Sequence, residues 1–450
     1  MQQDLIWVGV IVLVALAFIP YFLKFRKEQR VVADRKKEAH SMGIDRPRAQ
    51  YPMINRSLCI GCGSCVQACP EGDVIGVVWG IAEVINGERC VGHGYCEKAC
   101  PVGALKVGLG DLTSRPDIPI LTPTNETTVP GLFIAGELGG LSLIRHAIAQ
   151  GQMVMEEVAR RVPETKASDA YDVIIVGAGP AGLSAALTAK QHNLSYIVLD
   201  QTGVGGTILH YPRRKLVMTQ PIQIPLFGWL KEEEYSKEFL METWQKIVAK
   251  FQITINTNEP VESVQKIGEL FSVKTPVTTH SSKFVVLAMG RRGVPRRIDA
   301  PGEDLPKVLY QLIDAQSYRN QKMLVVGGGD SAVEAAVGLA KQPGNQVAIS
   351  YRKTSFFRVK KKNEDAVNRM IADKKIIPYW ESQVVGVTEK SVKLSTSQGE
   401  IEIPNDYVIV QIGGIPPFEM LRQMGISFGG NQRSTKEMDA TFRAPASARI

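Results

Sequence analysis

The stretch that decides the fold is YDVIIVGAGPAGLSAALTAKQHNLSYIVLD, residues 171–200. An apolar strand leads into Gly177-x-Gly179-x-x-Gly182, a helical run follows, and a second strand ends in Asp200. Glycines at this spacing allow a tight turn whose backbone N–H groups approach a pyrophosphate at a helix N-terminus, while the acid can bind ribose hydroxyls. With both strands, the helix and the acid in place, the stretch predicts a βαβ unit that binds a dinucleotide.

A second unit of this kind begins at KMLVVGGGDSAVEAAVGLA, residues 322–340, which contains Gly327-x-Gly329-x-x-Ala332. Its next strand has no acid at its end. The residues found there instead are Ser350, Tyr351, Arg352 and Lys353, with Arg358 shortly after. Cations in this place favour a ribose 2′-phosphate, hence NADP(H) rather than NAD(H). The alternative is a solvated basic loop, since VKKKN continues the positive charge.

Two such units in one chain resemble the flavoproteins with two dinucleotide-binding domains, specifically the thioredoxin reductase-like group. VLAMGRRGVPRRIDAPGED resembles the crossover of that group into the NADP domain, and VIVQIGGIPP resembles its return to the FAD domain. VGGTILHYPRRKLVMT is similar to the flavin-side segment of the bacillithiol disulfide reductase branch. The resemblance covers roughly Asp172 to Gly429 and implies FAD and NAD(P)H as cofactors. The cofactor-binding residues predicted in this region are Gly177, Gly179, Pro180, Ala181, Gly182, Asp200, Gly206, Thr207, Gly290, Gly327, Gly329, Ser331, Ala332, Arg352, Lys353, Arg358 and Gly413.

The segment that ends the chain in this family has its counterpart near the middle of this sequence, before the first glycine motif. In the family, a last strand and a Gly-Asp turn contact the flavin, and a helix follows. Nothing after Ile426 supplies them, but TTVPGLFIAGELGGLSLIRHAIAQGQ, residues 127–152, resembles them closely, with Gly136 and Glu137 in the Gly-Asp place. The resemblance implies a circular permutation in which the segment before Asp172 completes the FAD domain. The helix Leu141–Gln150 would then cover the flavin with its positive end. An unrelated amphipathic helix is the alternative.

All seven cysteines lie in one block between Cys59 and Cys100. CIGCGSCVQACP has the spacing C-x2-C-x2-C-x3-C-P, in which three cysteines bind one 4Fe-4S cluster and the fourth binds its neighbour. Zinc prefers two separated pairs of ligands, and disulfides do not suit a cytosolic domain. The block therefore predicts iron–sulfur clusters, and it resembles a bacterial two-cluster ferredoxin over about 55 residues.

The second run, CVGHGYCEKACP, departs from that pattern because His93 stands where a second cysteine should be. By the crossover rule, one cluster takes Cys59, Cys62, Cys65 and Cys100, and the other takes Cys69, Cys90, Cys96 and a fourth ligand. We expect His93 to be that ligand, since imidazole binds iron and lies in the right register. A three-iron cluster or a solvent-ligated cube, with His93 nearby, remains open.

The formal charge of +8 does not indicate nucleic acid, because about +5 of it lies between Lys24 and Arg48. That basic stretch follows Leu5–Leu23, an uncharged run that would span roughly 28 Å as a helix, about one bilayer core. The pattern predicts an uncleaved single-pass membrane anchor with a cytoplasmic body. A cleaved signal peptide is the alternative, against which stand the absence of an amino-terminal basic residue and of a clear cleavage site.

The predicted fold is α/β, with two Rossmann-like domains, a small α+β ferredoxin domain and one N-terminal transmembrane helix. The segments expected in chain order are 1–24, the anchor; 25–54, a basic stalk or linker; 55–111, the two-cluster ferredoxin domain; 112–165, the permuted part of the FAD domain; 170–300, the FAD domain; 301–405, the NAD(P) domain; 406–430, the return to the FAD domain; and 431–450, a tail.

No cysteine lies outside the ferredoxin block, and Ala181 occupies the place of a cysteine in the bacillithiol branch. We therefore expect an NAD(P)H-dependent oxidoreductase that moves electrons through FAD and two 4Fe-4S clusters, not a disulfide reductase. No residue beyond the cofactors is predicted to be catalytic. The expected partner is a membrane cytochrome or a quinone-linked complex, and soluble ferredoxin is the alternative. A redox-sensing or assembly subunit without turnover is a further alternative, and the resemblance leaves a homodimer open.

Overall fold

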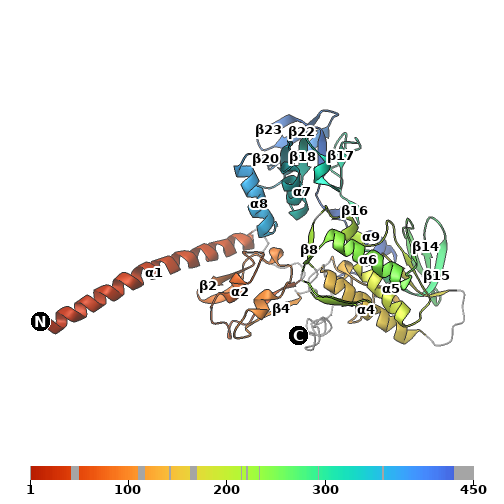
Figure 1. Cartoon of the computed structure of the whole chain (residues 1–450), viewed down its shortest axis with the longest axis horizontal. Helices are drawn as coiled ribbons and strands as arrows, with labels where there is room; N and C mark the ends of the chain where they lie inside the picture. The colour runs from red at the N-terminus through yellow and green to blue at the C-terminus, as the bar shows by residue number, and fades with distance from the viewer. Residues whose placement is uncertain are drawn as a thin grey trace. The chain divides into compact units, whose positions relative to one another are not determined.

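The chain is described from a computed structural model, which defines residues 2–41, 50–109, 117–140, 143–162, 170–213, 215–218, 221–232, 234–291, 293–356 and 359–429. Two compact units are present (Figure 1). Unit 1 is Met1–Gly110 with Lys360–Lys362, and unit 2 is Asp111–Val359 with Asn363–Ile450. The predicted tail 431–450 lies outside the described residues.

Unit 1 contains a long helix and a small cysteine-rich fold. The helix is α1 (Gln2–Ser41). Two antiparallel strand pairs follow, β1 (Gln50–Ile54) with β4 (Leu105–Leu109) and β2 (Ile75–Val78) with β3 (Ile81–Val84). The short helices are α2 (Ser64–Gln67), the 3-10 turn η1 (Gly87–Arg89) and α3 (Tyr95–Lys98). Because β1 pairs with β4, the cysteine-rich fold begins at Gln50, five residues before the predicted start.

The described helical part of the predicted linker 25–54, residues 25–41, is docked on the cysteine-rich fold. The Gln29 side chain is buried and its Oε1 accepts the Trp79 N–H at 2.6 Å. Arg35 pairs with Asp73 at 2.8 Å, and Lys36 pairs with Glu83. The second half of α1 therefore packs on the β2–β3 hairpin instead of forming a free stalk.

The predicted membrane span Leu5–Leu23 falls on α1. Among the residues that the structure describes, no helix is both long enough and apolar enough to cross a bilayer. Most side chains of α1 before Phe18 lie outside the described residues.

The first sheet of unit 2 has the strand order β12-β7-β6-β15-β14-β13, with β5 also paired to β15. The bounds are β5 (Leu132–Ile134), β6 (Tyr171–Val176), β7 (Tyr196–Leu199), β12 (Ile255–Asn256), β13 (Ser263–Ile267), β14 (Leu270–Lys274) and β15 (Thr279–Leu287). Alternate residues of β6 enter two separate cores, Val173 and Ile175 on one face and Ile174 and Val176 on the other. Residues 173–176 are buried on both faces, which is why they are all apolar and show no alternation. Asp172, at the start of the strand, is buried in an ion pair with Lys283.

The helices α4 (Ile144–Arg161) and α5 (Pro180–Gln191) pack against each other on this sheet (Figure 1). The remaining elements before residue 252 are η3 (Glu137–Gly139), η4 (Gly206–His210), β8 (Leu216–Met218), β9 (Ile222–Ile224), β10 (Gly228–Leu230), β11 (Glu234–Ser236) and α6 (Lys237–Phe251). Strand β5 runs parallel to β15 with Leu132 opposite Val285, so the segment before Asp172 is part of this sheet.

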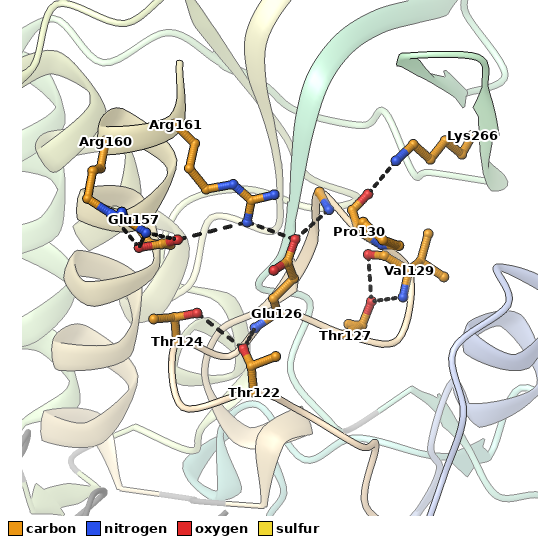
Figure 2. A network of polar contacts seen from close by, with 11 residues as sticks. Thr122, Thr124, Glu126, Thr127, Val129, Pro130, Glu157, Arg160, Arg161 and Lys266 are labelled. Atoms are coloured by element: carbon orange, nitrogen blue, oxygen red, sulfur yellow. Dashed lines mark hydrogen bonds and ion pairs between the residues drawn. The ribbon is translucent and has the colours of Figure 1, made fainter. Parts of the chain in front are cut away.

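A polar network ties that segment to α4 and to the sheet (Figure 2). The Glu126 carboxylate accepts the Gly131 N–H at 2.7 Å and pairs with Arg161 at 2.8 Å. The guanidinium of Arg161 also lies 5.2 Å from the centre of the Phe284 ring, and Lys266 donates to the Pro130 carbonyl at 2.7 Å. These contacts hold both ends of the β5–α4 segment in unit 2.

The start of this segment pairs with the last residues that the structure describes. The Ile120 N–H donates to the Ser427 carbonyl at 2.9 Å, and the Gly429 N–H donates to the Ile118 carbonyl at 3.0 Å. Residues 118–120 and 427–429 therefore lie antiparallel, although about three hundred positions separate them in sequence.

The second sheet of unit 2 has the order β17-β24-β18-β19-β20, all parallel. Its strands are β17 (Val308–Leu309), β18 (Lys322–Val326), β19 (Gln346–Tyr351), β20 (Ile376–Trp380) and β24 (Tyr407–Val410), with helices α7 (Asp330–Ala340) and α8 (Lys361–Ala372). The other elements are β16 (Val294–Pro295), η5 (Ala315–Ser317), β21 (Gln383–Val387), β22 (Ser391–Thr396), β23 (Gly399–Pro404), β25 (Gly414–Ile415) and α9 (Phe418–Gln423). The predicted boundary at 405 is too early, because β24 still pairs with β18 in the second sheet.

Candidate dinucleotide and iron–sulfur sites

The first glycine turn is built by close backbone contacts. Gly177 has a φ of +109°, and a Cβ there would lie 2.5 Å from the Ala288 carbonyl oxygen. A Cβ on Gly182 would lie 1.8 Å from the Gly177 oxygen, so α5 can begin against β6 only with glycine there. Around Gly179 the space is open, and the nearest atom to its would-be Cβ is a Gly206 Cα at 3.8 Å. The open space beside a helix N-terminus fits a pyrophosphate.

Asp200 follows β7 and lies beside this turn, as the sequence predicts. It is 8% exposed, and its Oδ2 accepts the Ala178 N–H at 2.7 Å. Its Oδ1 accepts the N–H groups of Thr202 at 2.8 Å and Gly203 at 2.7 Å. One carboxylate therefore fixes the glycine turn and the loop after β7 together.

Residues that are distant in sequence converge on this turn. The would-be Cβ of Gly206 lies 3.0 Å from the Gly179 Cα, and that of Gly290 lies 3.9 Å from the Thr207 hydroxyl. The would-be Cβ of Gly136 lies 3.3 Å from the Ala181 Cβ. Pro180 occupies the first turn of α5. Three separate segments thus come together at one glycine turn, as the predicted flavin site requires.

The turn at Gly136 and Glu137 depends on a residue that the sequence did not single out. Gln150 is fully buried, and its Oε1 accepts the Gly136 N–H at 2.7 Å. Its Nε2 has no hydrogen-bond partner among the residues that the structure describes. Burial raises the pKa of the Glu137 carboxyl, and Arg291 opposes that shift. The predicted helix Leu141–Gln150 begins later, at Ile144, and residues 141 and 142 lie outside the described residues.

The second glycine turn has the same backbone plan. The Gly327 N–H donates to the Ser350 carbonyl at 2.9 Å, and Gly329 has no atom within 4 Å of a would-be Cβ. The would-be Cβ of Gly327 lies 3.1 Å from the Cβ of the fully buried Ala332. The open space again fits a phosphate-bearing ligand.

The other predicted residues of this region are spread more widely. Ser331 lies in the first turn of α7, and Arg352 and Lys353 are exposed after β19. Gly413 lies between β24 and β25, and its carbonyl accepts the Arg296 N–H at 3.0 Å. Arg358 lies outside the described residues.

The cysteines of unit 1 surround two hollows. The first, of about 330 Å³, is lined by a set from both cysteine runs, Cys59, Cys62, Cys65 and Cys100. The second, of about 310 Å³, is lined by Cys69, Cys90, Cys96 and His93. The sequence predicts this division, in which the last cysteine of each run crosses to the other hollow.

Among the described residues, no three His, Cys, Asp or Glu side chains are placed to hold a single metal ion. Each hollow is instead lined by one of the two ligand sets that the cysteine spacing assigns to a cluster.

The pKa of a cysteine here depends on its burial and its hydrogen bonds, and burial raises that of Cys65 in the first hollow. Burial raises the pKa of Cys90 to about 11 and that of Cys96 to about 12. A hydrogen bond with Ser64 lowers the pKa of the exposed Cys62. The N–H groups of Ala82 and Ala104 donate to the sulfurs of Cys59 and Cys100 at 3.3 and 3.2 Å. A nearby cation favours the thiolate form of such buried thiols, and the iron of a bound cluster would supply that charge.

His93 lies in the wall of the second hollow and is 7% exposed. Its Nε2 is 3.5 Å from the Glu71 Oε1, and its ring stacks with that of Tyr95 at 5.5 Å between centres. His93 therefore lies beside the second set of cysteines, where the sequence predicts it.

Comparison with known proteins agrees with this geometry. Residues 174–441 match the pyridine nucleotide-disulphide oxidoreductase family, and residues 51–101 match the 4Fe-4S dicluster domain. The chain belongs to the pyridine nucleotide-disulphide oxidoreductases. It is thus an NAD(P)H-dependent flavin enzyme with a 4Fe-4S domain.

Two curated relatives and one solved structure show the range of similar proteins. A ferredoxin–NADP reductase of Ignicoccus hospitalis is 30% identical over 267 residues, 58% of this chain and 83% of the relative. The bacilliredoxin reductase Bdr of Bacillus subtilis is 27% identical over 259 residues, 56% of this chain and 80% of the relative. The bacillithiol disulfide reductase Bdr of Staphylococcus aureus has a TM-score of 0.52 at 26% identity, covering 57% of this chain and 81% of that chain.

Proposed function

We propose that this pyridine nucleotide-disulphide oxidoreductase transfers electrons between NADPH and a redox partner, using FAD in unit 2 and two 4Fe-4S clusters in unit 1. One observation carries the proposal: all seven cysteines of the chain lie around the two hollows of unit 1. A flavin enzyme that reduces a disulfide with its own thiols needs a cysteine near the flavin, and Ala181 stands in the glycine turn here. The clusters are then the redox groups left to exchange electrons with the flavin.

The chain's own residues hold the groups that this function requires. Bound FAD supplies the exchange between the hydride of a nicotinamide and the single electrons that clusters carry. The open turn at Gly179 and the carboxylate of Asp200 would hold the flavin dinucleotide. The open turn at Gly329, with Arg352 and Lys353 nearby, would hold NADPH.

The relatives bear on the redox partner. Several of them are named ferredoxin–NADP reductase, and this chain carries a ferredoxin-like unit of its own. We infer that unit 1 serves as a built-in ferredoxin and passes electrons on to an external acceptor. That acceptor is a membrane cytochrome or a quinone-linked complex if α1 anchors the chain, and soluble ferredoxin is the second candidate.

The anchor itself is part of the proposal. The uncharged run Leu5–Leu23 precedes a basic stretch, which is the charge order of a single-pass helix with a cytoplasmic body. Fractionation of cells with an alkaline carbonate wash tests it. The chain should stay in the membrane pellet, and a variant that begins at Lys24 should be released. Release of the full chain by the wash would contradict the anchor.

We also propose that unit 2 is circularly permuted relative to its family. The parallel pairing of β5 with β15 supports this, because the segment before Asp172 occupies a place in the first sheet. The antiparallel pairing of residues 118–120 with 427–429 also supports it, because a short loop could join the two segments. Joining 429 to 117 by a short loop and starting the chain at 170 should yield a soluble FAD-containing protein. Failure of this rearranged chain to retain FAD would contradict the permutation.

His93 is proposed as the fourth ligand of the second cluster. Replacing a thiolate by a neutral imidazole makes the cluster less negative and should raise its reduction potential. His93→Cys should therefore lower the potential of one cluster and leave the other unchanged, as followed by EPR during a redox titration. His93→Ala is the matched control, and it should convert that cluster to a three-iron signal. If neither variant alters any cluster signal, His93 is not a ligand.

The electron path is tested by anaerobic titration of the full-length protein with NADPH and then with NADH. Flavin bleaching together with reduced-cluster EPR signals is the expected result, with NADPH effective at the lower concentration. The variant Cys96→Ser should lose one cluster signal and keep flavin bleaching. Bleached flavin with fully oxidised clusters would contradict the path from NADPH to the clusters and favour a sensing or assembly role.

A further inference from the structure

The β2–β3 hairpin of unit 1 lies along the second half of α1, and its direction there is fixed by contacts. In order along α1, the contacts are Gln29 with Trp79, Val32 with Gly76, and Arg35 with Asp73. As α1 runs forward from 29 to 35, the hairpin strand therefore runs back from 79 to 73. The turn of the hairpin is thus the part nearest the amino-terminal half of α1.

The turn itself has an unusual residue. Val78 pairs with Ile81, so Trp79 and Gly80 form a two-residue turn. The φ of Trp79 is +51°, a conformation in which such turns favour Asn, Asp or Gly and in which a bulky aromatic residue is an outlier. The Trp79 side chain is 57% exposed. Neither the backbone nor burial in unit 1 accounts for a tryptophan at this turn, so a contact outside the chain is indicated.

A second exposed apolar side chain lies beside the turn. A Cβ on Gly61 would lie 2.1 Å from the Gly80 carbonyl oxygen, so the cysteine loop 59–62 packs on the turn. Ile60, in that loop, is 63% exposed. Both Ile60 and Gly61 line the first hollow. Ile60 and Trp79, called the apolar tip below, therefore belong to the end of unit 1 that contains the first hollow.

The position of the apolar tip relative to the predicted anchor follows from α1. Gln29, which accepts the N–H of the turn, stands six residues after Leu23 (29 − 23), or about 9 Å along a helix. The headgroup layer of a bilayer is about 5–8 Å thick on each side. Three exposed cations that anionic headgroups would attract occupy the interval, Lys24, Arg26 and Lys27. The tip thus comes to the edge of the headgroup layer, where tryptophan is enriched.

We propose that the apolar tip, Ile60 and Trp79, is a second membrane-contact site, which enters the headgroup layer and holds unit 1 against the lipid surface. Gln29 is the positioning residue, because its side chain ties the turn to α1. The proposal rests on the anchor proposed above and adds which face of unit 1 meets the bilayer.

The same contact orders the two hollows relative to the bilayer. The first hollow includes Ile60 of the tip. The second is lined by Val74 and Ile75, which lie at the start of β2 and away from the turn. A membrane acceptor would therefore approach unit 1 at the first hollow.

Photo-cross-linking of the full-length chain in nanodiscs of phosphatidylcholine and phosphatidylglycerol tests the proposal. Three variants each carry p-benzoyl-phenylalanine in place of one exposed residue, Leu16 in the predicted anchor, Trp79 in the tip or Glu38 farther along α1. Glu38 is the matched control, since it stands fifteen residues after Leu23 (38 − 23), about 22 Å along the helix and beyond the headgroups. Mass spectrometry of the labelled peptide after irradiation measures the lipid adduct.

We expect lipid adducts at 16 and at 79, and about tenfold less at 38, because only the first two positions reach lipid. Adding Gln29→Ala to the chain labelled at 79 removes the acceptor of that N–H. It should lower the adduct about fivefold, the factor that one ordinary hydrogen bond gives. Visible spectra report the bound FAD and clusters, which none of the substitutions should change.

The outcomes separate this proposal from the anchor. A lipid adduct at 16 without one at 79, or equal yields at 79 and 38, would overturn the apolar tip and leave the anchor standing. Cross-links from 79 to a second copy of the chain in place of lipid would also overturn it. An unchanged yield with Gln29→Ala would overturn the positioning role of Gln29. Without an adduct at 16 the anchor is refuted, and the yield at 79 then decides by itself whether the tip meets lipid.

Discussion

The two glycine turns of unit 2 share a backbone and differ in the side chains around it. Each follows a buried parallel strand, each begins a helix, and each leaves open space over its second motif glycine. They differ at the third motif position, Gly182 against Ala332, and at the strand end, Asp200 against Tyr351. One backbone plan therefore leaves space that fits a phosphate in both units. The residue after the next strand sets what can stand in the middle of the turn, Ala178 beside Asp200 and Gly328 beside Tyr351.

The largest effect is expected at the third motif position. Gly182→Ala places a methyl group 1.8 Å from the Gly177 oxygen, so α5 must move away from β6. We expect a loss of about 3 kcal/mol in the free energy of unfolding and poor retention of FAD. The matched change Ala332→Gly removes a methyl group from the second turn and should cost about 1 kcal/mol. Chemical denaturation and the FAD content of the purified proteins measure both, and equal losses would show that the two turns are packed alike.

The second largest effect is expected at Asp200, the residue that follows β7. Asp200→Ala removes the acceptor for three backbone N–H groups, those of Ala178, Thr202 and Gly203. Because hydrogen bonds to a charged group contribute about 1.5–3 kcal/mol, we expect the FAD dissociation constant to rise about 100-fold. Tyr351→Ala is the control at the equivalent position and should leave FAD binding unchanged. Fluorescence titration of the two apoprotein variants with FAD measures both dissociation constants. An unaltered constant for Asp200→Ala would contradict the role of Asp200 in holding the FAD-binding turn.

A smaller effect, on one ligand at a time, is expected at the two glycines with open space around them, Gly179 and Gly329. Gly179 and Gly329 have φ values of −76° and −101°, which any residue can adopt. A methyl group at either should leave the fold stable within about 0.5 kcal/mol but reach into the phosphate space. Gly179→Ala should weaken FAD about 30-fold and spare 2′,5′-ADP, and Gly329→Ala should do the reverse. Calorimetry with both ligands tests this, and a loss of both by either variant would mean that the two sites are not independent.

The smallest effect is expected from the exposed cations after β19. Arg352→Ala should weaken 2′,5′-ADP about tenfold at low salt, less at high salt, and leave ADP unchanged, because an exposed charge is screened. Lys341→Ala removes an equally exposed charge at the far end of α7 and should change neither probe. Equal losses in the two variants would indicate a general effect of net charge.

The elements with local signals were predicted from the sequence. Strand β6, the turn at Gly177 and the helix α5 are contiguous, so the apolar run, the glycine spacing and the helical pattern are all visible in thirty residues. The crossing of Cys69 and Cys100 between two hollows also follows from spacing, because a short loop can place only three sulfurs around one cube.

The elements that depend on distant pairing were missed or misplaced. Strand β1 was assigned to a linker, since its partner β4 lies fifty residues later. The boundary at 405 was wrong because VIVQIGG carries both the last strand of the second sheet and the start of the return. No sequence pattern pointed to Gln150, because its role depends on one hydrogen bond that its side chain accepts from the buried Gly136 N–H.

The sequence by itself determined the two βαβ units, the cysteine block and the resemblance of residues 127–152 to the end of the family's chain. These rest on covalent spacing, which a linear pattern contains in full. Only the tertiary structure decided that β5 enters the first sheet beside β15 and that Gln150 buttresses Gly136. It also showed why position 328 is glycine: the Tyr351 ring occupies the space that a Cβ there would need. Close packing is the physical reason, because a residue's tolerance is set by neighbours that the chain brings from elsewhere.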